Sequence, residues 1–262
     1  MIIAAHKAYR MPADPMYLPL QVGAAGKESI GYQRDDEGEN ISLLNPSFCE
    51  LTGLYWAWKN LDADYLGLVH YRRHFSFHPD AEDPWSSVLT EQELASFLGK
   101  ISLFVPAVRN YYIETLYSHY GHTHYASQLD ETRKIIREKN SGDLACFDAV
   151  LQQRGGYMFN MLIARRDLLD DYCAWLFDIL FELRNRIGQA AEQLDSFQGR
   201  LYGRVSEILF NVWLEKNLRS GMLKREEIME IPVIHMEKVD WKKKGMAFLK
   251  AKITGKKYQK SF

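Results

Sequence analysis

The residues with the clearest potential for chemistry follow a short apolar run in the first third of the chain. Residues 65–69 read Tyr-Leu-Gly-Leu-Val, and His70, Tyr71, Arg72 and Arg73 come directly after them. A run of this length with a glycine inside is typical of a buried parallel strand, and the polar residues mark its carboxyl end. Ligands of open α/β sheets bind just outside such strand ends. Because guanidinium groups pair with phosphate in a bidentate manner, the pattern favours a diphosphate site over arginines that only face solvent.

A second polar pair follows the apolar start of the chain. Residues 2–5 read Ile-Ile-Ala-Ala and are followed by His6 and Lys7. If residues 2–5 form a parallel strand of the same sheet, both side chains reach the edge that carries Arg72 and Arg73. His6 on its own fits an ordinary polar loop equally well.

Glu207 is a carboxylate that could transfer protons. Arg204, Glu207 and Asn211 are spaced by three and four residues, so a helix would place them on one face. Glu207 is therefore a candidate general base, or a hydrogen-bond acceptor for sugar hydroxyls. A surface ion pair with Arg204 explains the spacing equally well.

Two patterns resemble metal sites only superficially. Asp62 and Asp64 form an Asp-x-Asp pair, but they precede the strand at 65–69, so a loop or helix cap is the better interpretation. His119, His122 and His124 are close in sequence, but no Cys, Asp or Glu lies at a matching helix spacing. Contact with an acceptor substrate or surface placement is the better interpretation for them, and we predict no metal site.

The elements that must position these residues alternate between strand and helix. This alternation predicts an α/β fold with a mainly parallel sheet, flanked by helices. The strands are expected at residues 2–5, 65–69, 101–105, 157–164 and 231–234. The helices are expected at residues 45–58, 90–98, 111–139, 167–187 and 203–214, with a polar linker at 188–200.

Composition limits the class of protein. The chain of 262 residues is 47% hydrophobic and 13% aromatic, which is enough to bury a large core. Its three cysteines are widely spaced and odd in number, which argues against a disulfide framework and for a reducing compartment. We read the apolar start as a strand rather than a signal peptide, and no apolar stretch approaches the length of a membrane span.

The net charge of −1 conceals an asymmetry. Nine lysines and one acid lie in residues 238–262, so this segment carries +8 and the rest of the chain −9. A body with this balance is not a nucleic-acid binder. Trp241 and Phe248 stand among the lysines, a mixture that binds anionic membrane surfaces, although a disordered solubilising tail is the simpler alternative. We therefore divide the chain into a domain at residues 1–236 and a basic, membrane-associating tail at 237–262.

Several segments, in order along nearly the whole chain, resemble one family. It comprises the small bacterial glycosyltransferases of capsule, exopolysaccharide and O-antigen assembly known as DUF4422. The matching segments are Ile3–Lys7, Asn40–Ser42, Cys49–Thr52, Tyr55–Asn60, Gly67–Arg73, Asn160–Met161, Tyr172–Phe177, Gly203–Glu207 and Trp213–Leu214.

The resemblance implies a GT-A-like fold and transfer of a hexosyl unit, galactose-type in pyranose or furanose form, from a UDP-sugar to a lipid-linked saccharide. This would take place at the cytoplasmic face of the cell membrane. The sequence departs from the wider GT-A pattern, because the polar run at residues 70–73 replaces the usual Asp-x-Asp after the strand. We therefore expect Arg72 and Arg73 to neutralise the leaving diphosphate without a metal cofactor, Mg²⁺ or Mn²⁺ being the alternative.

The same resemblance suggests roles for the other polar residues. Glu207 is the first choice for the base, with Asp143 and Asp148 in reserve, and the stereochemistry of transfer stays open. The acceptor is expected at His119 and His124. The predicted donor-binding residues are His6, Lys7, Asp36, Asn40, His70 and Asn160, of which Asp36 and Asn40 would hold the uridine and ribose.

Two other classes compete with this prediction. A phosphate-transferring or nucleotide-sugar-modifying α/β protein is disfavoured, because the sequence lacks both G-x-G-x-x-G and G-K-[ST] loops. A non-catalytic, membrane-docked saccharide-binding or scaffold protein is the second alternative. It would need no phosphate site, so it would tolerate the loss of Arg72.

Overall fold

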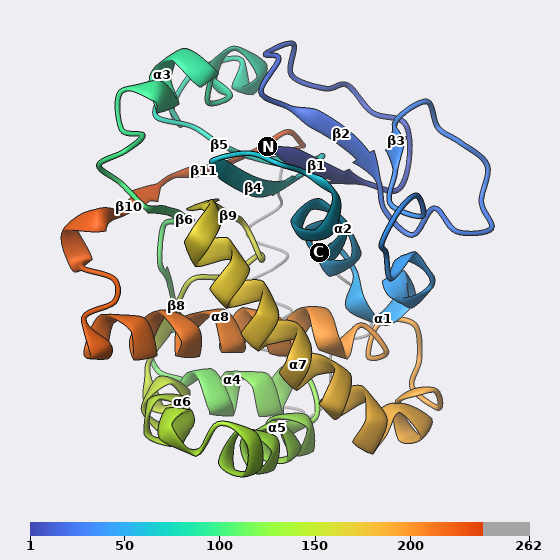
Figure 1. Ribbon diagram of the computed structural model, residues 1–262, viewed down its shortest axis with the longest axis vertical. Helices are drawn as coiled ribbons and strands as arrows, with labels where there is room; N and C mark the ends of the chain where they lie inside the picture. The colour runs from blue at the N-terminus through green and yellow to red at the C-terminus, as the bar shows by residue number, and fades with distance from the viewer. Residues whose placement is uncertain (238–262) are drawn as a thin grey trace.

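A nine-stranded mixed sheet organises residues 1–237, the part of the chain that the computed structural model describes (Figure 1). Seven strands follow one another in the order β10-β6-β9-β4-β1-β2-β3, and β5 pairs with both β4 and β11. The strands of this sheet are β1 Ile2–Ala5, β2 Leu18–Gln21, β3 Gln33–Arg34, β4 Tyr65–His70, β5 Arg73–Phe75, β6 Leu103–Pro106, β9 Leu162–Arg165, β10 Ile228–Ile231 and β11 Val233–His235.

The antiparallel strand β9 separates two parallel parts of the sheet, one of which is the pair β10–β6. β1 runs parallel to β2 and to β4, and β2 runs parallel to β3, so these four strands end at one edge. β9 runs antiparallel to both of its neighbours, β4 and β6. The segment that leads into β9 therefore arrives at the edge where β1, β2 and β4 end.

Both faces of the sheet are covered, which explains the unbroken apolar run of β1. Ile2 and Ala4 face the larger core, which is shared with the helices, while Ile3 and Ala5 face a smaller core on the other side. A strand buried on both faces has no polar alternation, as expected for the parallel part of a sheet. The smaller core is closed by residues 85–97, which include the short helix α3 (Glu91–Ala95).

The helices form the second half of the molecule. α2 and α7 contact the sheet, α8 crosses below it, and α4, α5 and α6 lie on the far side of α8 (Figure 1). None of the helices in residues 1–237 has the length and apolar character needed to cross a bilayer. The helices are α1 Asn45–Phe48, α2 Leu51–Asn60, α3 Glu91–Ala95, α4 Leu116–Thr123, α5 Ala126–Lys139, α6 Leu144–Gln152, α7 Arg166–Ala191 and α8 Leu201–Ser220. Short 3-10 turns lie at Ser42–Leu44, Pro84–Ser87, Ser141–Asp143 and Arg225–Glu227.

Helices α4, α5 and α6 form an excursion from the sheet. The chain leaves the sheet after β6 and returns to it at β9. The excursion begins at β7 (Arg109–Asn110) and ends at β8 (Gly155–Gly156), and these two short strands pair antiparallel with each other. The chain therefore enters and leaves the helical group at one place.

Two predicted helices are broken in the structure. The helix expected at 45–58 is split into α1 and α2 because Cys49 adopts a left-handed conformation (φ 55°), and the Asn45 side-chain amide donates to the Cys49 carbonyl that the break frees (2.8 Å). The helix expected at 111–139 begins only at Leu116 and breaks at His124, which is extended. There the Gln198 amide donates to the carbonyl of Thr123 (3.1 Å). In both cases a side chain replaces the lost helical hydrogen bond.

Other boundaries also differ from the prediction. The strand expected at 157–164 begins only at Leu162, because Phe159 and Asn160 are left-handed (φ 76° and 53°) and cannot lie in a ladder. The strand expected at 231–234 is divided at Pro232, which has no N–H to donate. The linker expected at 188–200 is shorter, since α7 continues to Ala191. The α/β class itself is confirmed.

Candidate active site

A cavity of about 1690 Å³ opens where the parallel strands end. His6 follows β1, Val22 follows β2 and His70 ends β4, and all three line the cavity. The opposite wall comes from α4, the start of α8 and the loop at 194–200 between α7 and α8. The cavity exceeds the roughly 300–1,000 Å³ of a usual small-molecule pocket.

Backbone strain is concentrated at this cavity. In residues 1–237 four residues other than glycine have a left-handed φ: Cys49, Tyr112, Phe159 and Asn160. The first three line the cavity, and Asn160 follows Phe159 directly. Such conformations cost about 1–3 kcal/mol each and persist mostly where function requires them. The strain therefore marks the cavity as a functional site.

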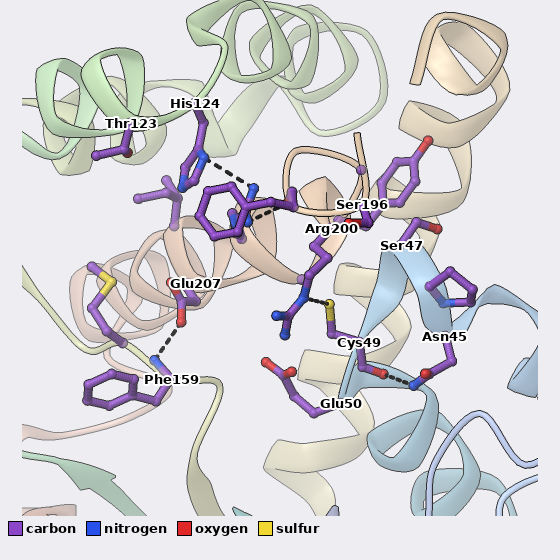
Figure 2. A pocket seen from close by; sticks show the side chains of 18 of the residues that line it. Asn45, Ser47, Cys49, Glu50, Thr123, His124, Phe159, Ser196, Arg200 and Glu207 are labelled. Atoms are coloured by element: carbon purple, nitrogen blue, oxygen red, sulfur yellow. Dashed lines mark hydrogen bonds between the residues drawn. The ribbon is translucent and has the colours of Figure 1, made fainter. Parts of the chain in front are cut away.

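Glu207 projects from α8 into the cavity. It is half-buried, and its Oε1 accepts a hydrogen bond from the Phe159 N–H (2.7 Å; Figure 2). Burial, together with the negative charge of Glu50, raises the pKa of Glu207 to about 7, against the smaller opposing effects of that hydrogen bond, Arg109 and Arg73. A carboxylate with this pKa can accept or donate a proton near neutral pH.

Glu50 is a second carboxylate in the cavity, and the sequence analysis assigned it no role. It stands between α1 and α2, immediately after the break at Cys49 (Figure 2). Its Oε1 accepts a hydrogen bond from the side-chain amide of Asn160 (2.6 Å). The sequence offered only one indirect signal, the match of the segment Cys49–Thr52 to the family.

Positive charge surrounds His6 at the end of β1. Burial lowers the pKa of His6, and the nearby charges of Arg72, Lys7, Arg200 and Lys27 lower it further. His6 is therefore neutral at neutral pH. Arg72 also forms an ion pair with Glu237 (3.1 Å), but about half of its side chain stays exposed. His6, Lys27, Arg72 and Arg200 form an anion-attracting corner of the cavity. The diphosphate contact predicted for His6, Lys7, Arg72 and Arg73 stays a prediction.

Further arginine side chains line the cavity. The Arg73 guanidinium lies over the ring of Phe159, 4.7 Å from its centre. The Arg200 Nε donates to the Cys49 sulfur (3.1 Å), and its terminal nitrogens point into the cavity (Figure 2). In total seven arginine or lysine side chains and four acidic side chains line the cavity: Lys27, Arg72, Arg73, Arg109, Arg184, Arg200 and Arg204 against Glu50, Glu192, Asp195 and Glu207. The cavity is thus cationic overall.

The spacing of Arg204, Glu207 and Asn211 does not reflect the surface ion pair offered above as the alternative, because Arg204 binds Phe197 instead. Arg204 donates to the Phe197 carbonyl (2.5 Å) and lies over the Phe197 ring. Asn211 donates to the main-chain carbonyl of Glu207 (2.7 Å) and to that of Tyr157. Both neighbours on the helix face therefore hold local structure, and the Glu207 carboxylate is bound by Phe159 instead.

His70, His119 and His124 line the cavity. His70 Nε2 donates to the carbonyl of Phe159 (2.7 Å). His119 Nδ1 lies 2.9 Å from the buried carboxylate of Glu114, which also bonds to His122. This acid precedes the helix, so the search by helix spacing missed it.

The Nδ1 of His124 lies 3.1 Å from a guanidinium nitrogen of Arg204 and 3.1 Å from the side-chain oxygen of Gln198. His119 and His124 come from the wall that faces the strand ends. This placement is compatible with the acceptor-binding role predicted for them, which stays a prediction.

Four predicted donor-binding residues do not line the cavity. Lys7 lies beside it, with its ammonium 5.7 Å from the ring centres of Tyr9 and Tyr71. Asn160 is buried behind it, where it binds Glu50, so its role is indirect.

Asp36 and Asn40 lie in the loop that follows β3. Asp36 is bound by Arg34 through two hydrogen bonds (2.9 and 2.6 Å). The Asn40 amide donates to the carbonyls of Asp36 and Gly38. Both side chains are used to shape their own loop, and the uridine contact predicted for them has no support from these positions.

The reserve bases and the Asp-x-Asp pair also lie outside the cavity. Asp148 is paired with Arg133 (2.6 Å), and Asp143 accepts from the indole of Trp175 (2.8 Å). Asp62 and Asp64 are exposed and precede β4, as expected of a loop. Within residues 1–237 no group of three His, Cys, Asp or Glu side chains is arranged to hold a metal ion. All three cysteines are free thiols.

Comparison with known proteins gives one family and one solved structure. Residues 1–218 match the family model described as "Domain of unknown function (DUF4422)". The apo structure of the WbbM bifunctional glycosyltransferase is similar, with a TM-score of 0.79 and 29% identity. The match covers 90% of this chain and 45% of that one, so this chain spans less than half of its length. No protein with curated annotation matches. The similarity confirms the predicted GT-A-like glycosyltransferase fold.

Proposed function

The chain belongs to the DUF4422 family, and we propose that it is a glycosyltransferase of polysaccharide synthesis. It would move a hexosyl unit, galactose-type in pyranose or furanose form, from a UDP-sugar to a lipid-linked saccharide in capsule, exopolysaccharide or O-antigen assembly. The similar solved structure is that of a bifunctional glycosyltransferase, WbbM, which supports the class of reaction. The donor and the acceptor rest on the family resemblance.

One observation carries the proposal: the cavity combines an anion-attracting corner with a carboxylate that titrates near neutral pH. The corner lies at the end of β1, around His6, with Lys27, Arg72 and Arg200 nearby. Glu207 lies in the same cavity, and its pKa is raised to about 7. A glycosyl transfer needs both, since it releases a diphosphate and takes a proton from the acceptor hydroxyl.

These residues suggest a reaction by direct displacement. The bond between the sugar carbon and the diphosphate oxygen breaks, and its electron pair leaves with the diphosphate. Arg72 and Arg200 stabilise the charge that develops there, which lowers the barrier if they meet the departing group better than the bound donor. The acceptor oxygen forms the new bond, and Glu207 accepts its proton. This path inverts the configuration of the sugar carbon, so a retained configuration would argue for a different role of Glu207.

The acceptor and the membrane complete the proposal. His119 and His124 face the strand ends across the cavity and are proposed to bind the acceptor saccharide. We further propose that the protein acts at the inner face of the cell membrane and binds anionic lipid through the basic residues of the tail at 237–262. All of the tail except Glu237 lies outside the residues that the structure describes.

We also propose that transfer needs no metal ion. Arginine and lysine side chains already supply positive charge to the cavity, so a divalent cation is not required to neutralise the diphosphate. Mg²⁺ or Mn²⁺ dependence is the alternative.

The test is a panel of nucleotide sugars incubated with the purified protein, with release of the nucleoside diphosphate as the readout. Calorimetric titration with UDP measures the donor site directly. We expect UDP to bind, one UDP-hexose to be turned over, and Arg72→Ala to weaken both. Arg133→Ala, which removes an arginine from a pair outside the cavity, is the matched control. Binding of saccharide without UDP binding or turnover would indicate the non-catalytic, membrane-docked saccharide-binding or scaffold protein instead.

A further inference from the structure

We propose that Glu50 is a second catalytic carboxylate of this site, and that the strained pair Phe159–Asn160 is the positioning element that holds both carboxylates in the cavity. The inference rests on the proposed glycosyl transfer and adds to it. In this reaction Glu50 stabilises the positive charge that develops on the sugar ring as the diphosphate leaves, while Glu207 takes the acceptor proton.

The local backbone places Glu50 in the cavity. Had the helix run on from Asn45 to Trp58, residue 50 would lie in the interior of that helix. The left-handed Cys49 breaks it, and Glu50 then precedes the first turn of α2 and lines the cavity (Figure 2). The side-chain amide of Asn45 stabilises this break by donating a hydrogen bond to the Cys49 carbonyl. A backbone conformation that costs energy is therefore maintained at Cys49, immediately before a carboxylate of the cavity.

Asn160 connects Glu50 to the helix that carries Glu207. Its amide nitrogen donates to Glu50 Oε1 (2.6 Å) and to the carbonyl of Gly203 (2.8 Å). Its amide oxygen accepts from the hydroxyl of Ser206 (2.8 Å). Asn160 is only 7% exposed, and these three bonds fix the orientation of its side chain. Since an amide nitrogen can only donate, Asn160 holds Glu50 through a carboxylate oxygen.

Phe159 connects the same segment to Glu207 and to His70. Its N–H donates to Glu207 Oε1 (2.7 Å), and its carbonyl accepts from His70 Nε2 (2.7 Å). Two consecutive residues with left-handed φ are rare outside glycine. Here they direct the Phe159 N–H to Glu207, the Phe159 carbonyl to His70 and the Asn160 side-chain amide to Glu50. A turn that only led into β9 would not need these contacts.

The electrostatics agree with a division of roles. After burial, the charge of Glu50 is the largest cause of the raised pKa of Glu207. When two carboxylates share one site, one of them keeps its proton to a higher pH. A fixed negative charge beside a sugar that becomes oxocarbenium-like stabilises the transition state more than the neutral ground state.

The test replaces Glu50 with glutamine, which retains the size of the side chain and can still accept from Asn160. The matched control is Glu39→Gln, because Glu39 binds Tyr55 and Lys59 outside the cavity. We expect Glu50→Gln to lower kcat by at least about tenfold, with the Kd for UDP changed less than about threefold. The acid limb of the pH–rate profile should move to lower pH by about one unit, because Glu207 loses the neighbouring charge.

A second measurement does not depend on activity. A ¹³C NMR titration of the Glu207 carboxyl should show its midpoint at lower pH in Glu50→Gln than in the unaltered protein, and unchanged in Glu39→Gln. A midpoint that does not move, or a kcat within about twofold of the unaltered protein, would overturn the inference. If the unaltered protein turns over no nucleotide sugar, the proposed transfer fails, while the titration still decides whether the two carboxylates are coupled.

Discussion

Replacing Glu207 with glutamine is expected to lower activity and, at high pH, to raise stability. In the proposed reaction Glu207 accepts the acceptor proton, and a positioned base contributes about 100- to 10,000-fold to a rate. We therefore expect Glu207→Gln to lower kcat by this factor and to leave UDP binding nearly unchanged. In the unaltered protein the rate should rise with pH through about 7, because the base must be ionised. About one tenth of it is ionised one unit below that value.

The effect on stability follows from the same pKa. Folding raises the pKa of Glu207 from 4.5 to about 7, so the folded state binds this proton more tightly than the unfolded state. Its contribution to the free energy of unfolding therefore falls as the pH rises from 4.5 to 7 and stays low above that. At about 1.4 kcal/mol per pKa unit, ionised Glu207 costs the fold at most about 3.5 kcal/mol at high pH. Glu207→Gln removes this cost, so it should be more stable than the unaltered protein at about pH 8 and nearly equal to it at pH 4.5.

Urea unfolding at these two pH values, together with a turnover assay, measures both effects. Glu215→Gln is the control, because Glu215 lies on the same helix but binds Arg219 outside the cavity. The reasoning would be refuted by a variant that keeps more than about a third of the activity, since a general base contributes far more than that. It would equally be refuted by a variant that is less stable than the unaltered protein at high pH.

Three further results are expected. EDTA should leave turnover unchanged, and strict dependence on Mn²⁺ would contradict the metal-free proposal. Arg200→Ala should raise the Kd for UDP by about 10- to 100-fold, because a hydrogen bond to a charged group contributes about 1.5–3 kcal/mol; Arg219→Ala on the exposed face of α8 should not change it. Gly67→Ala in β4 should lower the free energy of unfolding by about 1–3 kcal/mol in denaturant titrations, because the added Cβ would lie 3.0 Å from both the Ile163 side chain and the Leu162 carbonyl. A stability equal to that of the unaltered protein would show that β9 moves aside.

The part of the site that follows strand ends could be predicted from the sequence. The change from an apolar run to His70 and Arg72 is abrupt, and its position at the end of β4 is confirmed. Glu207 was found because helix spacing is regular and its neighbours are polar. These signals are local, so they survive without knowledge of the tertiary structure.

The part that depends on breaks in regular structure could not be predicted. Glu50 lines the cavity only because Cys49 is left-handed, and a cysteine in that conformation leaves no mark in the sequence. Asn160 was predicted to bind the donor. It binds Glu50 from behind the cavity instead, because the strand begins only at Leu162, two residues after Asn160. Asp36 and Asn40 illustrate the opposite case, in which polar residues in a loop serve that loop. Tertiary contacts decided each of these positions.

Because strands β7 and β8 pair with each other, the two ends of the helical excursion lie side by side, and the excursion can be grafted as one segment. Residues 109–156 depart and return through one short ladder, but their helices also pack against α7 and α8. This segment carries His119 and His124, for which we propose acceptor binding. A graft of it between homologues, made together with the faces of α7 and α8 that it contacts, offers a direct route to hybrid transferases.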